Sequence, residues 1–392
     1  MWNDVPTLLG AGLILLGIFI LGYIGFRTRF PNVILYILFG ISIAGLIHEN
    51  EILQFSGEVA IVLLFFLLGL EFNMSRLGGM ARKIWSSGLL DVLLSLFVSI
   101  IIAVMFGADL FSAFVIGSIT FATSSTITAK LLDDKGRMAN AETEYILGIL
   151  VFEDLVAPIL VAIIIALSSG DQFTGMDMLL LIGKILGLAL IAVVLGKTVF
   201  KRFEKFLLRI DDEDFKIVLL VGIAVAFGGL AVSLGLSEVL GAFLAGVMLA
   251  EIGKIEQVEG TVSPVKDLLL PTFFVYFGTT IELGNGIPFV GMLISLVAWS
   301  LIAKVLLGII GGKLYGLPKR VALRAGLSLC ARGEFSVVIA GVAAGSIKVF
   351  GGVYIIITAF LGMMIFNYAP NITTKIYGKP PKKKKNLRVP TV

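Results

Sequence analysis

The sequence has very little of the chemistry that most metal sites and covalent scaffolds use. Its 392 residues include one cysteine, Cys330, and one histidine, His48. A zinc cage, a Cys–His nucleophile pair or a haem held by two histidines would therefore lack ligands. A single cysteine excludes a disulfide-rich secreted chain. The 45 glycines follow no three-residue period, which excludes a collagen-like chain.

Charge is also scarce. Asp, Glu, Lys and Arg make up 15% of the chain, whereas hydrophobic residues make up 58% and the mean hydropathy is +1.04. A soluble domain usually carries about 25% charged residues, and disorder requires low hydrophobicity. The composition therefore indicates a polytopic membrane protein.

Long apolar runs give the number of membrane spans. A spanning helix needs about 20 mostly apolar residues. Apolar runs and charged breaks predict about thirteen transmembrane helices, roughly at 5–26, 31–47, 58–74, 84–106, 111–131, 143–168, 176–199, 215–233, 237–251, 267–281, 288–311, 321–345 and 349–376. We expect an all-α protein with one transmembrane domain, 1–378, and a basic cytoplasmic tail, 379–392.

The basic residues predict the orientation of the chain. If the N-terminus lies outside, all the Lys and Arg residues except Lys184, Lys304, Arg332 and Lys348 fall in the odd-numbered connections and the tail. The positive-inside rule then predicts an outside N-terminus, a cytoplasmic C-terminus and a multi-pass protein of the cell (plasma) membrane. The lysines of the tail are interpreted as a topology anchor, with binding to anionic lipid as the alternative.

Some charges are placed where lipid makes them costly. A charge at the middle of the bilayer costs about 2.5–3.5 kcal/mol and usually marks a functional site. The apolar runs contain six such charges: Glu153, Asp154, Lys184, Lys304, Arg332 and Glu334. We expect Lys184 to snorkel or to pair locally. Glu71 and Asp91 lie closer to cytoplasmic ends and need less explanation.

The adjacent acids Glu153 and Asp154 are the strongest candidates for chemistry. They lie near the middle of the span 143–168. Neighbouring residues on a helix point about 100° apart, so one carboxylate can face a cavity while the other binds an internal partner. A carboxylate that holds either a proton or a cation is what exchange of the two requires. The alternative is a structural ion pair.

Polar breaks interrupt two spans at matching places. The span 111–131 contains Thr123, Ser124, Ser125 and Thr126, and the span 321–345 contains the Arg332–Gly333–Glu334 sequence. Transporter sites are commonly built from broken helices near the midplane. For the first break, the alternative is an unbroken helix in which the Ser and Thr hydroxyls bond to backbone carbonyls of the same helix.

The breaks suggest an internal repeat. Each lies in the fifth span of a six-span half, and the halves cover about 5–168 and 215–376, with a linker helix at 176–199. One half starts outside and the other inside, so we predict two inverted-topology six-helix repeats with the site between them. Lys304, in the fourth span of the second half, can reach the acid pair.

Several segments give the chain a family resemblance. FLLGLEFNMSRL, TFATSSTITAKLL, ETEYILGILVFEDLVAPIL, LGAFLAGVMLAE and LSLCARGEFSVVIA begin at Phe66, Thr120, Glu142, Leu240 and Leu327. With them the chain resembles the Kef-type monovalent cation:proton antiporters of the cation–proton antiporter-2 branch. Within this branch it is most similar to potassium/proton antiporter membrane subunits of the KhtU type.

The resemblance implies a sodium/proton-antiporter-like fold with crossed broken helices, a homodimer, and a core that moves against a fixed scaffold. It implies that Asp154 binds the monovalent cation or a proton, beside Glu153, and that oxygens of Thr123 to Thr126 act as ligands. Lys304 would pair with Glu153, and Arg332 and Glu334 would compensate charge. A separate cytosolic regulatory subunit is also implied.

The sequence thus predicts a secondary antiporter, not an enzyme, that exchanges K⁺, or alternatively Na⁺, for H⁺ by alternating access. Its expected partners are the transported ions and the bilayer, with no cofactor and no nucleic acid. A cation channel and a sodium-coupled solute symporter remain the alternatives, because the same acids and broken helices would serve them.

Overall fold

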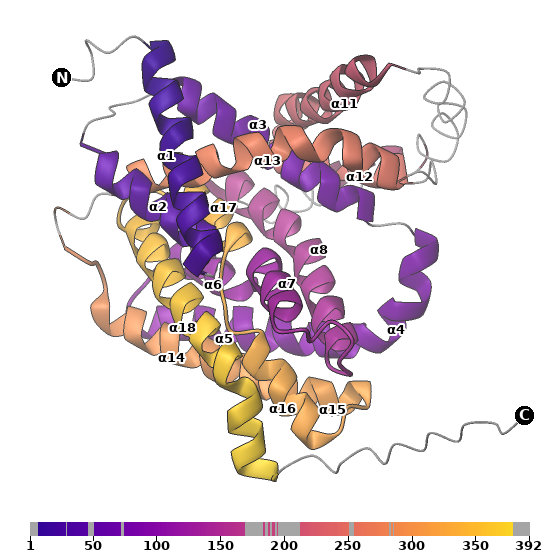
Figure 1. The fold of residues 1–392 in the computed structure, drawn as a ribbon, viewed down its shortest axis with the longest axis vertical. Coiled ribbons are helices and arrows are strands. Elements are labelled where there is room, and N and C mark those ends of the chain that lie inside the picture. The colour runs from indigo at the N-terminus through magenta and orange to yellow at the C-terminus, as the bar shows by residue number, and fades with distance from the viewer. Residues whose placement is uncertain are drawn as a thin grey trace, which may run out of the picture.

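The computed structural model describes residues 7–28, 30–45, 51–71, 74–168, 183–184, 187–188, 190–192, 194, 212–250, 255–281, 284 and 286–378. Within these ranges every regular element is helical and no strand occurs (Figure 1). Eight helical stretches among the described residues are long and apolar enough to cross a membrane. The described part of the chain therefore has the all-helical, polytopic architecture that the sequence predicts.

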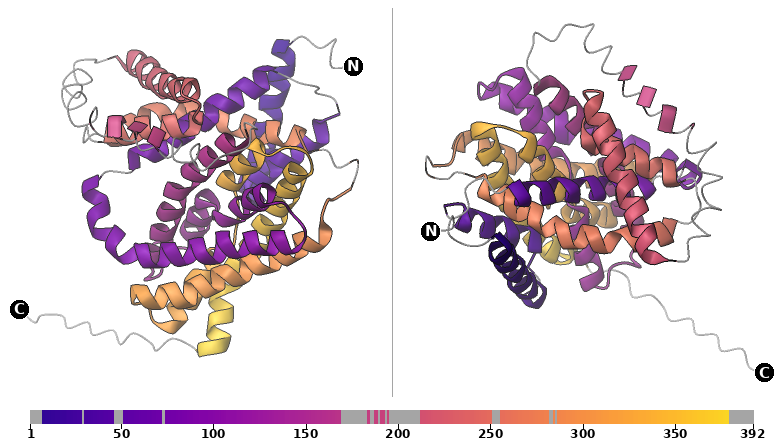
Figure 2. Two further views of the ribbon diagram at one scale, coloured as in Figure 1. Left: turned by 180° about the vertical axis from the view of Figure 1, so that it is seen from behind. Right: turned by 90° about the horizontal axis from the view of Figure 1, so that it is seen from above.

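The helices pack into two groups, seen one above the other in Figure 1 and from behind and above in Figure 2. The first, the scaffold bundle, contains α1 (Thr7–Thr28), α2 (Asn32–Ile43), α3 (Glu51–Glu71), α11 (Glu213–Ser233), α12 (Glu238–Ala250) and α13 (Ile255–Thr279).

The second group, the core bundle, carries the candidate site. It contains α4 (Met74–Asp91), η2 (Val92–Phe97), α5 (Val98–Met105), α6 (Leu110–Phe121), α7 (Ser125–Asp134), α8 (Thr143–Ser168), α14 (Val290–Leu306), η4 (Leu307–Gly311), α15 (Gly312–Tyr315), α16 (Lys319–Ser328), α17 (Glu334–Val342) and α18 (Gly345–Tyr377). Each half of the sequence contributes to both bundles. The elements η2 and η4 are π-helical segments.

Three helices begin well before the apolar runs predict. The spans expected at 58–74, 84–106 and 267–281 begin inside helices that start at Glu51, Met74 and Ile255. Their first turns are polar, and polar residues end an apolar run without ending a helix, so hydropathy places these starts too late. The linker helix expected at 176–199 lies mostly, and the basic tail 379–392 wholly, outside the described residues.

Paired glycines allow the scaffold helices to cross at backbone contact. Gly69 of α3 lies against Gly246 of α12, and Gly40 of α2 lies against Gly278 of α13. A Cβ atom added at any of the four would overlap a backbone carbonyl oxygen of the facing helix. Small residues at helix crossings are the usual means of close packing in membranes. These crossings tie the first half of the chain to the second.

Replacing Gly246 with alanine should destabilise the scaffold bundle. The new methyl group would meet the carbonyl oxygen of Phe66 on α3, so the two helices must separate. Overpacking of this kind costs about 1–3 kcal/mol. We expect a lower melting temperature in detergent for Gly246→Ala and none of this loss for Gly222→Ala on α11, where nothing lies within 4 Å. Equal melting temperatures for the two variants would contradict this packing.

Candidate functional site

The site forms where two broken helices cross. The first break separates α6, which ends at Phe121, from α7, and the second separates α16 from α17, which begins at Glu334. The backbone N–H of Ser124 donates to the carbonyl of Ala331 at 2.9 Å, so the two extended segments bind each other directly. Gly333 is needed here, because a Cβ atom at this position would overlap the Ser124 side chain.

Glu334 of the second break binds the start of α7. Its Oε1 accepts bonds from the Ser125 hydroxyl at 2.8 Å and from the backbone N–H and hydroxyl of Thr126 at 3.0 and 2.9 Å. Its Oε2 accepts from the Ser124 hydroxyl at 2.7 Å. The first turn of a helix has unsatisfied N–H groups and a partial positive charge. The carboxylate therefore neutralises the N-terminus of α7 from the opposite break.

Arg332 binds the carbonyl ends of the other two half-helices. Its Nε donates to the carbonyl of Thr120 near the end of α6 at 2.9 Å, and its Nη1 donates to the carbonyl of Leu329 just after α16 at 3.3 Å. The side chain is fully buried. C-terminal helix ends carry partial negative charge, so the guanidinium compensates two of them at once.

Glu153 of α8 lies beside the first break. Its carboxylate accepts bonds from the backbone N–H of Thr123 and, at 3.1 Å, from the Thr123 hydroxyl. Lys304 of α14 donates to Glu153 Oε1 at 2.8 Å, and both side chains are fully buried. The structure thus brings Lys304 to the acid pair, as the sequence suggested, and links the pair to the crossing.

Asp154 follows Glu153 on α8 and is buried, with 5% of its surface exposed against none for Glu153. The two carboxylates point about 100° apart around the helix. Glu153 contacts Lys304 and the first break. Asp154 therefore lies on a neighbouring face of α8. The Lys184 ammonium, expected to pair locally, donates to the carbonyl of Leu234 at 3.1 Å.

Asp91 was not among the candidate residues of the sequence argument, but the structure places it beside Lys304. It is fully buried at the end of α4 and accepts from Lys304 Nζ at 2.7 and 2.9 Å. A signal was available in the sequence: Ser87, Asp91, Ser95 and Ser99 recur every four residues in an apolar span, and all four are buried. Such spacing forms one polar stripe along a helix.

The two partners of this ion pair each lie next to a π-helical segment. η2 begins directly after Asp91, and η4 begins three residues after Lys304. Side chains of other helices bind carbonyls of these segments: Trp299 donates to Leu94 at 2.9 Å, Tyr145 to Leu307 at 3.1 Å and Ser87 to Gly311 at 3.0 Å. Single π-helical turns are rare in proteins, and those that occur are frequently found at functional sites.

A second buried ion network lies between α7 and α8, and sequence reasoning did not find it. Glu142 is fully buried and pairs with Arg137 at 3.1 Å and with Arg324 of α16 at 2.6 Å. Arg137 also donates to the Ser328 hydroxyl at 2.9 Å, and its guanidinium stacks 4.5 Å from the centre of the Phe366 ring. The network fixes the loop after α7 to the half-helix α16.

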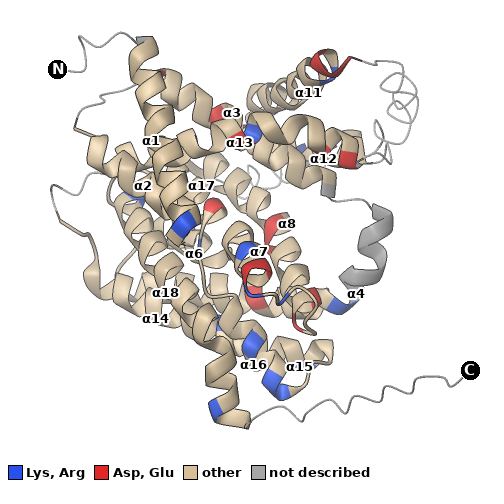
Figure 3. Cartoon of the chain, in the orientation of Figure 1, with Lys and Arg blue, Asp and Glu red and all other residues tan. Residues whose placement is uncertain are grey.

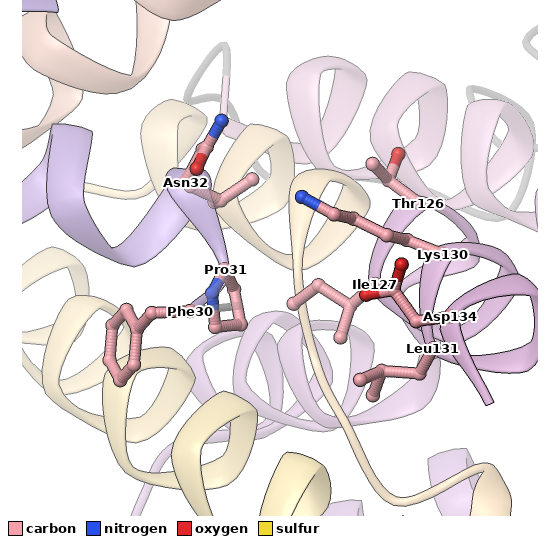
Figure 4. Close-up of a pocket in the computed structure, with 9 residues that line it drawn as sticks. Phe30, Pro31, Asn32, Thr126, Ile127, Lys130, Leu131 and Asp134 are labelled. Atoms are coloured by element: carbon pink, nitrogen blue, oxygen red, sulfur yellow. The ribbon is translucent and has the colours of Figure 1, made fainter. Parts of the chain in front are cut away.

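A pocket of about 90 Å³ opens between the start of α2 and one face of α7 (Figure 4). Phe30, Pro31 and Asn32 line one side. The other side carries residues spaced one turn apart, among them Thr126, Lys130 and Asp134. Because Thr126 also binds Glu334, the pocket reaches the N-terminus of α7.

These features define a class of protein. Two broken helices crossing inside an apolar bundle, with their ends neutralised by buried charges and an acid pair beside them, are the arrangement of a secondary transporter. Comparison with known proteins then identifies the family. The family model described as "Sodium/hydrogen exchanger, transmembrane" matches residues 13–370, and the chain belongs to this family.

Curated relatives and a solved structure agree with this family. The chain is 50% identical over 378 residues to the ammonium/H⁺ antiporter subunit AmhT of Alkalihalophilus pseudofirmus, covering 96% of this chain and 97% of that one. It is 28% identical over 324 residues to the K⁺/H⁺ antiporter subunit KhtU of Bacillus subtilis, covering 81% and 80%.

The fold resembles that of the sodium proton antiporter MjNhaP1 from Methanocaldococcus jannaschii, with a TM-score of 0.70 and 19% identity over 94% of this chain and 98% of that one. The protein is therefore a multi-pass cation:proton antiporter and a transporter rather than an enzyme. The prediction of antiport is confirmed over the channel and symporter alternatives.

Proposed function

We propose that the protein exchanges K⁺ or NH₄⁺ for H⁺ and that Asp154 is the carboxylate that binds either ion. The observation that carries this proposal is the pair of adjacent buried acids beside the crossing. Glu153 is held by Lys304 and Thr123. Asp154 retains some exposure and lies on the neighbouring face of α8. One acid then fixes the site while the other exchanges its ligand.

Hydroxyl oxygens near α7 are proposed to complete the cation site. Ser125 and Thr126 donate their hydroxyl hydrogens to Glu334, which leaves oxygen lone pairs on both for a second partner. Hard oxygen ligands suit an alkali cation. Thr123 and Ser124 would hold the break in place, through Glu153 and Glu334. No cofactor is needed for such an exchange.

The choice of K⁺ or NH₄⁺ is supported by the relatives. The one that is 50% identical is named for ammonium and the one that is 28% identical for potassium. These two ions have nearly the same radius and are larger than Na⁺. We rank Na⁺ below both, although the family is named for it.

Alternating access would move the core bundle against the scaffold bundle. The contact between them is apolar where α3 meets α17, with the rings of Phe65 and Phe335 5.4 Å apart. Dispersion contacts of this kind are not directional, so sliding breaks no hydrogen bond there. We further propose that the scaffold bundle forms a homodimer. We also propose that a separate cytosolic subunit regulates exchange, since both curated relatives are named as subunits.

We also propose a plasma-membrane location with the N-terminus outside and the C-terminus in the cytoplasm. Figure 3 shows Lys and Arg gathered on α15, α16 and the end of α18. These residues include Lys313, Lys319, Arg320 and Lys375. Basic residues near the ends of spans favour the cytoplasmic side.

Proteoliposomes with a pH-sensitive dye inside test the exchange. We expect pulses of K⁺ and NH₄⁺ to discharge a preformed proton gradient more strongly than Na⁺ or Li⁺, and choline to have no effect. Protein-free liposomes control for diffusion of ammonia. Cation currents without proton movement, or flux that requires an organic solute, would contradict the proposal.

The pocket of Figure 4 is proposed as the access route to Thr126. Lys130 repels cations there and Asp134 attracts them. Lys130→Gln should lower the KM for the cation by about twofold to fivefold, and Asp134→Asn should raise it by a similar factor, since a unit charge a few ångströms away in water is worth about 1 kcal/mol. Both effects should shrink at high ionic strength. Shifts in the same direction, or none, would exclude this route.

A further inference from the structure

An open groove of about 440 Å³ runs along the second half of α18. Its lining residues recur at spacings of three and four, so they form one face of this helix. The face is accessible, with 41% of Met364 and 55% of Tyr368 exposed. The groove therefore lies on the outer surface of the core bundle. Its lining residues include Leu361, Met364, Ile365, Tyr368, Asn371 and Lys375.

Polarity rises in one direction along the groove. Leu361 and Met364 lie at one end, and Tyr368 lies in the middle. Asn371 and Lys375 lie at the other end. From Leu361 to Lys375 the helix rises by about 21 Å, and half of a bilayer, headgroups included, is about 20–22 Å thick. Tyrosine and lysine side chains commonly lie at the level of the headgroups. The groove thus matches one leaflet from its acyl chains to its headgroups.

The polar end of the groove carries uncompensated positive charge. Lys375 is exposed in the last turn of α18, and the exposed Lys319 begins α16. Within the part of the chain that the structure describes, neither lysine forms an ion pair. In the sequence from 312 to 392 the only acid is Glu334, which is buried at the crossing. The charge of this end therefore favours an anionic ligand.

Arg320 fixes the end of α18 against α16. Its Nη1 donates to the carbonyl of Gly378 at 2.6 Å, and its Nη2 donates to the Thr374 hydroxyl at 2.8 Å. These bonds join the last turn of α18 to the first turn of α16. Because Lys375 follows Thr374, its backbone is held in place relative to α16. A binding surface that is already ordered loses less entropy when a ligand binds.

We propose that this groove binds one anionic phospholipid of the inner leaflet, with an acyl chain along its apolar end and the phosphate at Lys375. A cytosolic protein would reach Lys375 but not the apolar end, which lies at the depth of the acyl chains. A second copy of the chain, related by a two-fold axis, would bring like charges together. A free phosphate ion would leave the apolar end unused. The choice of leaflet rests on the proposed orientation, whereas the binding does not.

Native mass spectrometry of the full chain tests the headgroup contact. In titrations with phosphatidylglycerol and phosphatidylcholine of equal chain length, the wild type should bind phosphatidylglycerol more tightly. Lys375→Gln should weaken this binding by about fivefold, the factor that one basic residue near an anionic surface contributes. Binding of phosphatidylcholine should not change. Lys382→Gln removes the same charge from the tail and should keep the wild-type affinity. Equal losses in the two variants would indicate diffuse attraction and would overturn the site.

Two further variants test the acyl-chain contact. Met364→Trp fills the groove at an exposed position, so it should weaken phosphatidylglycerol binding severalfold without lowering the melting temperature. Met105→Trp, exposed at the end of α5, is the matched control and should bind like the wild type. An excess of inorganic phosphate should leave the lipid bound. Displacement by phosphate, or equal affinity of the wild type for the two lipids, would overturn the proposal.

Discussion

Replacing Asp154 with asparagine should reduce cation-driven proton flux to the level of protein-free liposomes. The amide has nearly the shape of the carboxylate but holds neither a proton nor a counter-charge for a cation at working pH. Exchange needs a group that binds the two in alternation, and Glu153 cannot substitute because Lys304 and Thr123 hold it. We expect a loss of at least about a hundredfold, equal to roughly 3 kcal/mol in the transport barrier.

Controls separate this effect from misfolding. Asp133→Asn changes an exposed carboxylate on α7 and should transport normally. Asp154→Asn should elute from size exclusion and melt like the wild type, because a neutral side chain in a buried site removes a desolvation cost rather than adding one. Flux at wild-type rates in the asparagine variant would remove Asp154 from the site.

Replacing Glu334 with alanine should cause the second large loss. Its carboxylate accepts four bonds from Ser124, Ser125 and Thr126, and each donor left unsatisfied costs about 1–3 kcal/mol. The N-terminus of α7 would also lose the charge that neutralises it. We expect a lower melting temperature and transport reduced by roughly a hundredfold.

The glutamine variant should reduce transport to an intermediate degree. Glu334→Gln can keep three of the four bonds through Oε1 and loses the charge, so its transport should lie between those of the wild type and the alanine variant. Glu259→Ala, on an exposed turn of α13, is the control for removing a carboxylate. Melting temperatures and initial flux rates, measured on the same preparations, test this order of the wild type, the glutamine variant and the alanine variant. Equal activity of Glu334→Ala and the wild type would show that the crossing does not depend on this residue.

Much of the crossing was predictable, because a membrane makes polar breaks conspicuous. Hydroxyl residues at 123–126 and the Arg332–Glu334 charges are costly in lipid, so they indicated interrupted helices, with an unbroken helix as the alternative for the first. Hydropathy does not predict which helix end is neutralised by which charge. Arg332 faces carbonyl ends and Glu334 faces an N-terminus, and this depends on the directions of helices far apart in sequence.

Asp91 shows where the sequence argument fails. Its nearness to the end of an apolar run made it seem solvated, yet α4 continues through it into η2 inside the core bundle. Only the fold places Asp91 next to Lys304, 213 residues away. The serine stripe along its helix was the signal that a hydropathy average discards.

The inverted repeat stays a prediction, but the glycine crossings are arranged as it requires. α3 crosses α12, and α2 crosses α13, each through one glycine pair. An inverted repeat relates α2 to α12 and α3 to α13, so it converts one crossing into the other. The sequence halves show no clear identity, because the repeat constrains the two small residues at each crossing and leaves the lipid-facing ones free.

The central claim is that a cation and a proton compete for Asp154. Isothermal titration of purified protein with K⁺ or NH₄⁺, repeated in two buffers of different ionisation enthalpy, counts the protons released on binding. The account predicts close to one proton per cation in the wild type at a pH where the site is protonated, and no binding heat in Asp154→Asn. Cation binding without proton release would contradict it.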